Sequence, residues 1–495
     1  MVNANELSSL HEVNIPFIYG KGDYGIADND IKTGFKWNSD DEKFAFAFID
    51  ELAKIAYAYA VKNGATLNKC SFIWTYPLSM NPNAINSFEG QWKRSYLKYF
   101  VNDNKKDIED ISDDEVTKMT ESIAPFLKYC EEDVNISQMA LSIDIGGGTS
   151  DVVIYKDSTD IHLASFRFAA DNIFGGGGSK AMSNRMIGKY YKIFSRELKD
   201  ADEKVRQLLK NFCSEKSQNK PSEANSVLFS LEDNPYLVDK KISYNGYLSK
   251  DQEFKVIFIY FYAAILYYLT DLLLTYGKPK PENILFSGTG SKLLNVIGNR
   301  TVLRDITTQL IQIFSNGKFQ YKKDIDITME RQRPKQLTAE GALWDENNEN
   351  SNEIADIFQG KKKAIDKLII QHTMLLSEDG DSCRTLLNKD LSDEKSLGII
   401  ISKVKDFHQK LDKLCSEDDF DLEEDYNCDK KARLFITELA QMEDKEIEDA
   451  LKNIFFTRHK KKELDERPDE VLADSALFFC PIIDIIDNFL KKEQE

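Results

Sequence analysis

The stretch from Leu141 to Tyr155 reads LSIDIGGGTSDVVIY, and it decides the fold class of this chain. Two runs rich in β-branched residues flank three consecutive glycines, a pattern typical of two strands joined by a tight turn. Glycine has no Cβ, so the backbone of this turn can approach a ligand closely. Successive N–H groups in such a turn bind anions, and we therefore expect Gly146, Gly147 and Gly148 to hold phosphate.

Polar side chains bracket the three glycines. Asp144 ends the first strand, Thr149 adds a hydroxyl donor, and Asp151 offers a second carboxylate at the start of the returning strand. A carboxylate beside a phosphate-binding turn suits Mg²⁺, which prefers oxygen ligands. The turn is not a P-loop, since no Gly-Lys-Ser/Thr closes it, and not a Rossmann fingerprint, since a strand follows it. The alternative interpretation is a glycine-rich hairpin turn with an acidic neighbour.

The hydrophobic pattern predicts a mixture of helices and strands around this hairpin. Residues 174–276 are expected to be largely helical, with a polar stretch near 215–250, and the polar residues 345–353 are expected to form a linker. Other expected elements are helices at 44–61, 88–100 and 121–131, and strands at 70–76, 161–168 and 283–287.

The composition of the chain indicates which kinds of partner and which cellular compartment to expect. The chain has 495 residues and a net charge of −18, which disfavours nucleic acid and anionic membranes as partners. Its seven cysteines and five histidines are dispersed without a C-x-x-C spacing, so we expect reduced thiols in the cytoplasm and no Cys/His metal site. No signal-peptide pattern opens the sequence. Val256 to Leu274 contains one charge, Asp271, and we favour a buried helix there over a membrane span.

The segment DIGGGTSD, residues 144–151, resembles the second phosphate motif of the superfamily of actin, the seventy-kilodalton heat-shock chaperone (DnaK-like) and sugar kinases. Further segments resemble that family's motifs in the same order, over about residues 40–345. They are FIWTYPL at 72–78, ESIAPFL at 121–127, FGGGGS at 174–179, NILFSGTGSKLL at 283–294 and TAEGALW at 338–344.

This resemblance implies an α/β fold, namely the two-lobed actin-like ATPase (ribonuclease H-like) fold with an added α-helical C-terminal region. The first lobe would span residues 1–170, the second lobe 171–345, and the charged helical region 346–495. The resemblance also implies ATP or ADP and Mg²⁺ as cofactors. The implied catalytic residues are Asp144, Glu121 and Thr149, the metal ligands Asp144 and Asp151, and the nucleotide contacts Gly146, Gly147, Gly148, Gly175, Gly176, Gly177, Gly288, Gly290 and Ser291.

Simpler interpretations stay open for some of these residues. Glu121 is also an ordinary acid at a helix N-terminus, and residues 175–178 also suit a flexible linker. The turn at 288–291 also suits a plain strand-to-helix turn. The family's first phosphate motif, an Asp-x-Gly-Thr hairpin, has its nearest candidate at residues 23–30, DYGIADND, which lacks flanking apolar strands. The chain is therefore either a fragment of a longer protein or a natural pseudo-ATPase, and we favour the fragment.

The leading functional hypothesis is an ATP-binding conformational switch, with hydrolysis left open. The alternative is a degenerate nucleotide-binding domain that serves as a protein-interaction scaffold. A small-molecule kinase would need a general base that the sequence does not identify, and actin-like filament formation is a further hypothesis. Expected partners are nucleotide and another protein or further domains. Chaperone activity is not implied, since nothing after residue 345 resembles a peptide-binding domain. Residues 477–490 are expected to form a docking helix, and 458–462 a solvated basic helix face.

Overall fold

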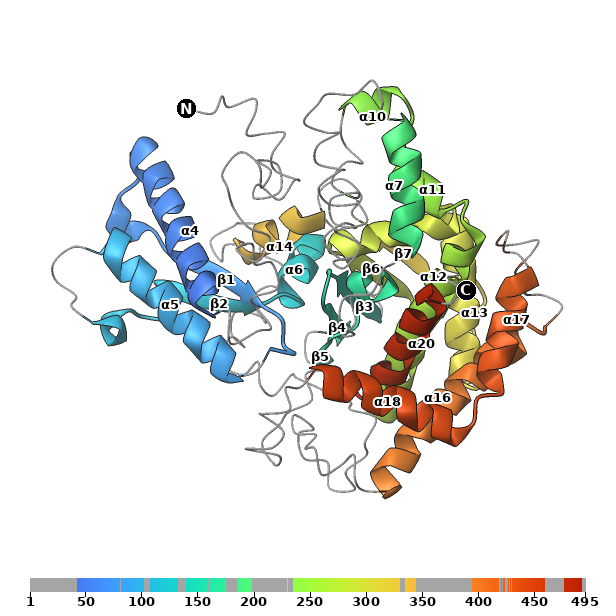
Figure 1. Ribbon diagram of the computed structural model, residues 1–495. Helices are drawn as coiled ribbons and strands as arrows, with labels where there is room; N and C mark the ends of the chain where they lie inside the picture. Colours follow the sequence, from blue (N-terminus) through green and yellow to red (C-terminus); the bar gives the residue numbers. More distant parts are fainter. Residues whose placement is uncertain are drawn as a thin grey trace.

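The computed structural model describes a chain of mixed helices and strands, so the fold class is α/β. A five-stranded sheet lies at the centre, a two-stranded sheet with its helices lies at one end, and the C-terminal helices lie at the other (Figure 1). The described residues are 42–80, 82–101, 107–131, 139–157, 160–174, 185–197, 229, 235–329, 334–343, 394–417, 420, 422, 426, 428, 430–458 and 476–491.

The central sheet has the strand order β5-β4-β3-β6-β7. The first three strands in sequence form an antiparallel meander, and the last two join on the other side of β3 as parallel strands. Their runs of Val, Ile, Leu and Phe are buried, as expected for strands covered on both faces. The bounds are β3 Ala140–Ile145, β4 Ser150–Asp157, β5 Asp160–Phe166, β6 Asn283–Ser287 and β7 Asp326–Met329.

Helix α12, Gln252–Thr275, forms the centre of the core on one face of the sheet. It begins at Asp251, whose carboxylate accepts the Phe254 N–H and also holds Lys189 and Tyr190 of α7, Arg185–Glu197. It is the one described helix long and apolar enough to cross a membrane, but nearly all of it is buried inside the protein. Such burial is typical of a core helix, which confirms the buried helix predicted from the sequence.

The two-stranded sheet pairs β1, Phe72–Tyr76, in parallel with β2, Val116–Thr120. The Phe72 ring packs edge-on against Trp92, Tyr96 and Phe100, which α5 presents to the sheet. The helices of this region are α4 Glu42–Lys62, α5 Pro82–Phe100, α6 Ile123–Glu131 and α14 Pro334–Ala342.

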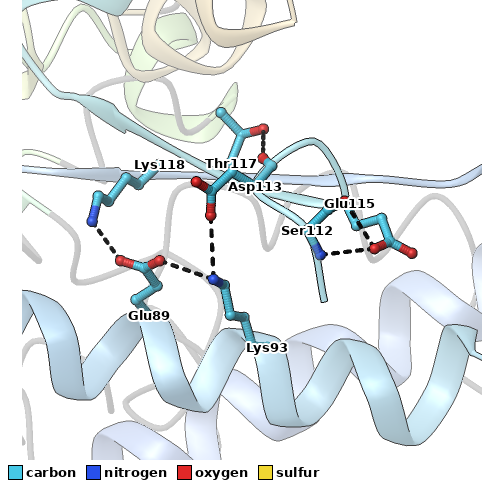
Figure 2. Close-up of polar contacts among 7 residues, drawn as sticks. All are labelled: Glu89, Lys93, Ser112, Asp113, Glu115, Thr117 and Lys118. Atoms are coloured by element: carbon cyan, nitrogen blue, oxygen red, sulfur yellow. Dashed lines mark hydrogen bonds and ion pairs between the residues drawn. The ribbon is translucent and has the colours of Figure 1, made fainter. Parts of the chain in front are cut away.

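An ionic network ties α5 to β2 across the surface of this region, as Figure 2 shows. Glu89 on α5 pairs with Lys118 of β2 at 2.5 Å and with Lys93 at 3.2 Å, and Lys93 reaches Asp113 at 3.3 Å. Because these groups are partly exposed to solvent, each pair contributes only about 0–1 kcal/mol. The network therefore orients β2 more than it stabilises it.

The C-terminal helices belong to the same core as the sheet. Phe479 of α20 stacks on Phe166 and Phe168 with ring centroids 4.8 and 4.6 Å apart, and Tyr260 of α12 bonds His408 of α16 at 2.8 Å. The buried face of α20 confirms the prediction of a docking helix at 477–490. The bounds are α16 Glu394–Leu414, α17 Lys430–Ala440, α18 Asp444–Arg458 and α20 Phe479–Lys491.

The packing does not divide at residue 170, where the sequence analysis placed a boundary between lobes. The central sheet takes strands from both sides of that residue, because β3 pairs directly with β6, and the C-terminal helices cover the same sheet. The remaining elements are η3 Leu67–Lys69, η4 Ile108–Asp110, η5 Ala170–Phe174, α10 Pro235–Asp239, α11 Tyr244–Leu248, η6 Thr289–Ile297 and α13 Arg300–Phe314.

Most predicted elements appear within a few residues of their expected bounds. Two strands were not predicted, β2 and β7, and the helix expected from Glu121 begins instead at Ile123. Both unpredicted strands are short, and β2 contains Lys and two Thr, so neither has a clear hydrophobic pattern. They are strands because each has an apolar neighbour to pair with, β1 and β6 respectively.

Candidate functional site

A row of polar side chains crosses the central sheet at the end of β3. Ser165, Asp151, Asp144 and Ser287 are direct register partners on β5, β4, β3 and β6. Alternate residues of a strand share a face, so these four lie on the face whose apolar members pack toward α6 and α14. A continuous polar row in a buried sheet is costly unless its members are satisfied or used, so this row marks the candidate site.

The glycine turn between β3 and β4 lies at the end of this row. Its Gly146 N–H donates to the Thr149 carbonyl at 2.8 Å, which closes the turn. The carbonyls of Gly146 and Gly147 accept the N–H groups of Ala170 and Asp171 at 3.2 and 2.8 Å. The short helix η5 therefore holds the turn from one side, and the turn is a fixed part of the fold.

The second glycine turn, which follows β6, interlocks with the first. Gly288 has φ +79°, and a Cβ there would overlap the Asp144 carboxylate and the Ile145 carbonyl. A Cβ on Gly290 would come within 2.5 Å of the Gly146 carbonyl oxygen. Glycine is required at both positions because the two backbones touch.

Ser291 also has a role inside the second turn. Its hydroxyl is buried and donates to the Gly288 carbonyl at 2.7 Å. Gly288, Gly290 and Ser291 thus lie where the sequence analysis placed them, beside the phosphate turn. Their contact with a nucleoside stays a prediction.

Asp144 lies between the two turns and is positioned from β6. The Ser287 hydroxyl donates to Asp144 Oδ2 at 3.0 Å, while Oδ1 lies against Gly288. Ser287 was not predicted as a site residue, although it immediately precedes the glycine turn in NILFSG. Its hydroxyl fixes the carboxylate's direction, since a charged acceptor gains more from a hydrogen bond than a neutral one.

Asp151 is fully buried beside Asp144, and its Oδ1 has no hydrogen-bond partner. Burial raises the pKa of the Asp151 carboxyl well above its ordinary value, and the carboxylates of Glu121 and Asp144 raise it further. The Glu121 N–H donates to the Tyr76 carbonyl at 2.9 Å, at the junction between the small sheet and α6. The structure therefore brings Glu121, Asp144 and Asp151 close enough for their charges to interact.

A further carboxylate, that of Asp171, lies against the glycine turn and was missed in the sequence analysis. Its Oδ2 would be 3.2 Å from a Cβ on Gly147. The available signal was its place, an acidic residue between the β5 strand and the glycine run 175–178. Loop position alone did not indicate it, because the contact depends on how η5 folds back over the turn.

The site gathers most of the predicted residues. Asp144, Thr149, Asp151, Glu121, the three glycines 146–148 and the turn 288–291 converge from separate stretches of chain. Gly175, Gly176 and Gly177 lie outside the described residues, as do residues 23–30, 345–353 and 459–462. Among the described residues, no three Asp, Glu, His or Cys side chains are gathered tightly enough to hold a metal ion by themselves.

Electrostatics restrict what can bind here. A phosphate brought to the glycine turn would meet the negative charge of the neighbouring Asp144 and Asp171 carboxylates. An anion is therefore stable at this turn only together with a cation, or with some of the carboxyls protonated. No protein-family model matches the chain, and no curated protein matches it in sequence.

Proposed function

We propose that this chain binds Mg²⁺-ATP or Mg²⁺-ADP at the paired glycine turns and acts as a nucleotide-dependent conformational switch of the actin-like, DnaK-like class. The observation that carries the proposal is the convergence of the two turns. They are about 140 residues apart in sequence, yet they interlock around Asp144 at the carboxyl ends of parallel neighbours β3 and β6.

The position in the sheet supports a ligand site. In open α/β sheets, ligands bind beyond the carboxyl ends of the strands, where consecutive connections leave in opposite directions. The chain leaves β3 toward β4, on one side, and leaves β6 toward β7, on the other. An antiparallel meander followed by two parallel strands is also compatible with the ribonuclease H-like lobe of the proposed fold.

The side chains suit Mg²⁺ in kind. Asp144, Asp151 and Thr149 offer oxygen atoms only, and Asp151 Oδ1 is a buried acceptor without a partner. Mg²⁺ usually keeps several waters and takes phosphate oxygens, so one or two protein carboxylates are enough to hold it. When bound, it would neutralise phosphate charge that the carboxylates alone would repel.

The residues of the chain then have separate tasks. The glycine turn and the Thr149 hydroxyl would hold phosphate oxygens, and Ser287 would keep Asp144 aimed at the metal or its waters. Glu121, just before α6, would orient a water molecule toward the phosphate. Such a site accelerates hydrolysis mainly by positioning, without a covalent intermediate.

A switch needs a moving part and a partner that responds to it. Glu121 links the small sheet to the site. Its backbone N–H donates to the Tyr76 carbonyl of β1, and its carboxylate helps to raise the pKa of Asp151. Nucleotide bound at the turns would therefore shift the region of β1, β2 and α6 relative to the central sheet. We propose that a protein partner or further domains respond to that shift, in the cytoplasm, where the free cysteines stay reduced.

A second candidate function, a protein-interaction scaffold, is favoured by one observation. The Gly146 N–H is already bonded within the turn, and Gly288 and Gly290 face protein backbone. A turn satisfied by its own chain needs no ligand. Against this, a scaffold has no need of the unpaired buried Asp151 Oδ1, which costs stability.

Calorimetric titration of Mg²⁺-ATP and Mg²⁺-ADP into the full chain tests the proposal. We expect binding that is lost in Asp144→Asn and retained in Asp113→Asn, a control at a carboxylate that is 90% exposed on the α5–β2 surface. Phosphate release by the wild-type chain, absent in Asp144→Asn, would then establish hydrolysis. Absence of heat with either nucleotide on folded wild-type protein would refute the nucleotide site and favour the scaffold.

A further inference from the structure

Helix α4 carries an apolar stripe on its outer surface. Phe44, Leu52, Ile55 and Tyr59 are 37%, 38%, 64% and 70% exposed, and Phe48, at 51%, lies in line with them. The spacing of four, four, three and four residues places all five on one side of the helix. Six of the eleven large hydrophobic side chains found exposed among the described residues belong to this single helix.

The stripe is not needed to hold α4 in place. The helix packs on α5 through a different face, formed by the buried Ala45, Ile49 and Ala53. Figure 1 shows α4 at one edge of the molecule, with α5 beside it. Since each large side chain carries about 150–250 Å² of surface, the exposed parts of the stripe amount to roughly 500 Å². That is at the upper end for an apolar patch without a function.

We propose that the stripe, Phe44 to Tyr59, is a self-association surface on which α4 of a second copy of this chain packs in antiparallel orientation. The stripe is symmetric about its middle residue, Leu52. An antiparallel pair places Leu52 against Leu52 of the partner subunit at the two-fold axis. The aromatic residue at one end, Phe44, then lies near Tyr59 of the partner subunit at the other end.

Charge supports the antiparallel choice of occupant. The first turn of α4 carries Glu42, which also accepts from Ser87 of α5, beside the exposed Lys43, and the last turn carries Lys62. In an antiparallel pair Glu42 lies near Lys62 of the partner subunit at both ends. Near the middle, Glu51 and Lys54 form an exposed pair at 3.3 Å, so no net charge there opposes the pairing. A parallel pair would instead bring like charges together and align the helix dipoles unfavourably.

The area that two stripes would bury indicates how tightly two copies of the chain would associate. With 21 residues, α4 is about 31 Å long, and two stripes would bury about 1,000 Å² in total. This is the lower limit for a specific interface, so a reversible dimer with micromolar affinity is expected rather than a permanent one. The inference is independent of nucleotide binding.

Sedimentation equilibrium of the full chain over a wide concentration range tests the dimer. Ile55→Lys is expected to weaken association about ten- to a hundredfold, because a buried apolar contact is lost and two charges are brought together. Val61→Lys is the matched control, since Val61 is 50% exposed on the same helix but lies off the stripe. Both changes replace a β-branched residue with a better helix former, so folding of α4 is preserved.

Crosslinking tests the orientation. Leu52→Cys is expected to form a dimer linked through residue 52 with a short thiol crosslinker, while Tyr59→Cys is not, since those positions lie far apart in an antiparallel pair. Wild-type protein shows the contribution of the native cysteines. A monomer at every concentration, equal weakening by Ile55→Lys and Val61→Lys, or crosslinking at both positions would each overturn the proposal.

Discussion

Replacing Gly288 with alanine tests the interlocked turns directly. Alanine at φ +79° and ψ 157° costs about 1–3 kcal/mol of backbone strain, because this region of backbone conformation is essentially restricted to glycine. The added Cβ would also overlap the Asp144 carboxylate and the Ile145 carbonyl, and such overpacking costs a further 1–3 kcal/mol or so. We therefore expect Gly288→Ala to lower the free energy of unfolding by about 2–6 kcal/mol.

Alanine substitutions at two other glycines measure the cost of backbone strain and the cost of steric overlap separately. Gly277 has φ +60° with no atom within 4 Å of the position that an alanine methyl group would take, so Gly277→Ala should cost only the strain, about 1–2 kcal/mol. Gly290 is not at positive φ but has the Gly146 carbonyl 2.5 Å from its Cβ position, so Gly290→Ala should cost only the contact, about 1–3 kcal/mol. The gain from restricting the unfolded chain is common to all three variants and cancels.

Urea unfolding followed by circular dichroism measures these differences, provided that the slope is the same for all variants. The structure requires Gly288→Ala to be the most destabilising of the three. If Gly288→Ala costs no more than Gly277→Ala, then β3 and β6 do not bring their turns into contact, and the candidate site loses its geometric basis.

Three further outcomes are expected. The pKa of Asp151 is raised in the folded state above its ordinary 3.8, so stability from this group is complete below that pH and is lost as the pH rises through the folded pKa. Asp151→Asn should therefore stabilise the chain increasingly from about pH 4 upward in urea titrations, yet weaken Mg²⁺-ATP binding; equal effects at all pH values would contradict this. Ser287→Ala should cost about 1–3 kcal/mol by removing one hydrogen-bond donor from Asp144, and should weaken Mg²⁺-ATP binding, whereas unchanged binding would leave Ser287 a packing residue only. Gly341→Ala should destabilise the chain by about 1–3 kcal/mol, because its Cβ would overlap the Ala124 carbonyl where α14 meets α6. Gly398→Ala, which has open space around it on α16, should stabilise the chain by up to about 1 kcal/mol. Thermal unfolding that ranks the two variants in the other order would contradict the contact between α14 and α6.

The hairpin at 141–155 could be predicted because its information is local. Two apolar runs and three glycines specify strands and a turn whatever surrounds them, and the structure places β3 and β4 there. The long apolar run at 256–274 likewise predicted α12 and its burial. Local patterns of this kind depend on the period of the side chains and on the backbone freedom of glycine, both of which are properties of neighbouring residues.

The exposed apolar stripe of α4 could not be predicted from the local sequence pattern. The apolar spacing predicted a helix at 44–61, and α4 covers that range, but apolar residues occupy two of its faces. The period alone gives no reason to bury Ala45 and Ile49 and leave Ile55 and Tyr59 exposed. That choice follows from the close approach of α5, which small residues such as Ala45 permit.

The sequence by itself therefore determined the α/β class, the glycine turn with Asp144, Thr149 and Asp151, and the acidic net charge. Only the tertiary structure decided that Ser287 and Asp144 are register partners, that Asp171 faces Gly147, and that the two glycine turns interlock. The physical reason is register: pairing between β3 and β6 joins residues about 140 positions apart, and a shift of one residue would turn every side chain of the row to the other face. That register is set by the packing of the whole core, which no short stretch of the chain contains.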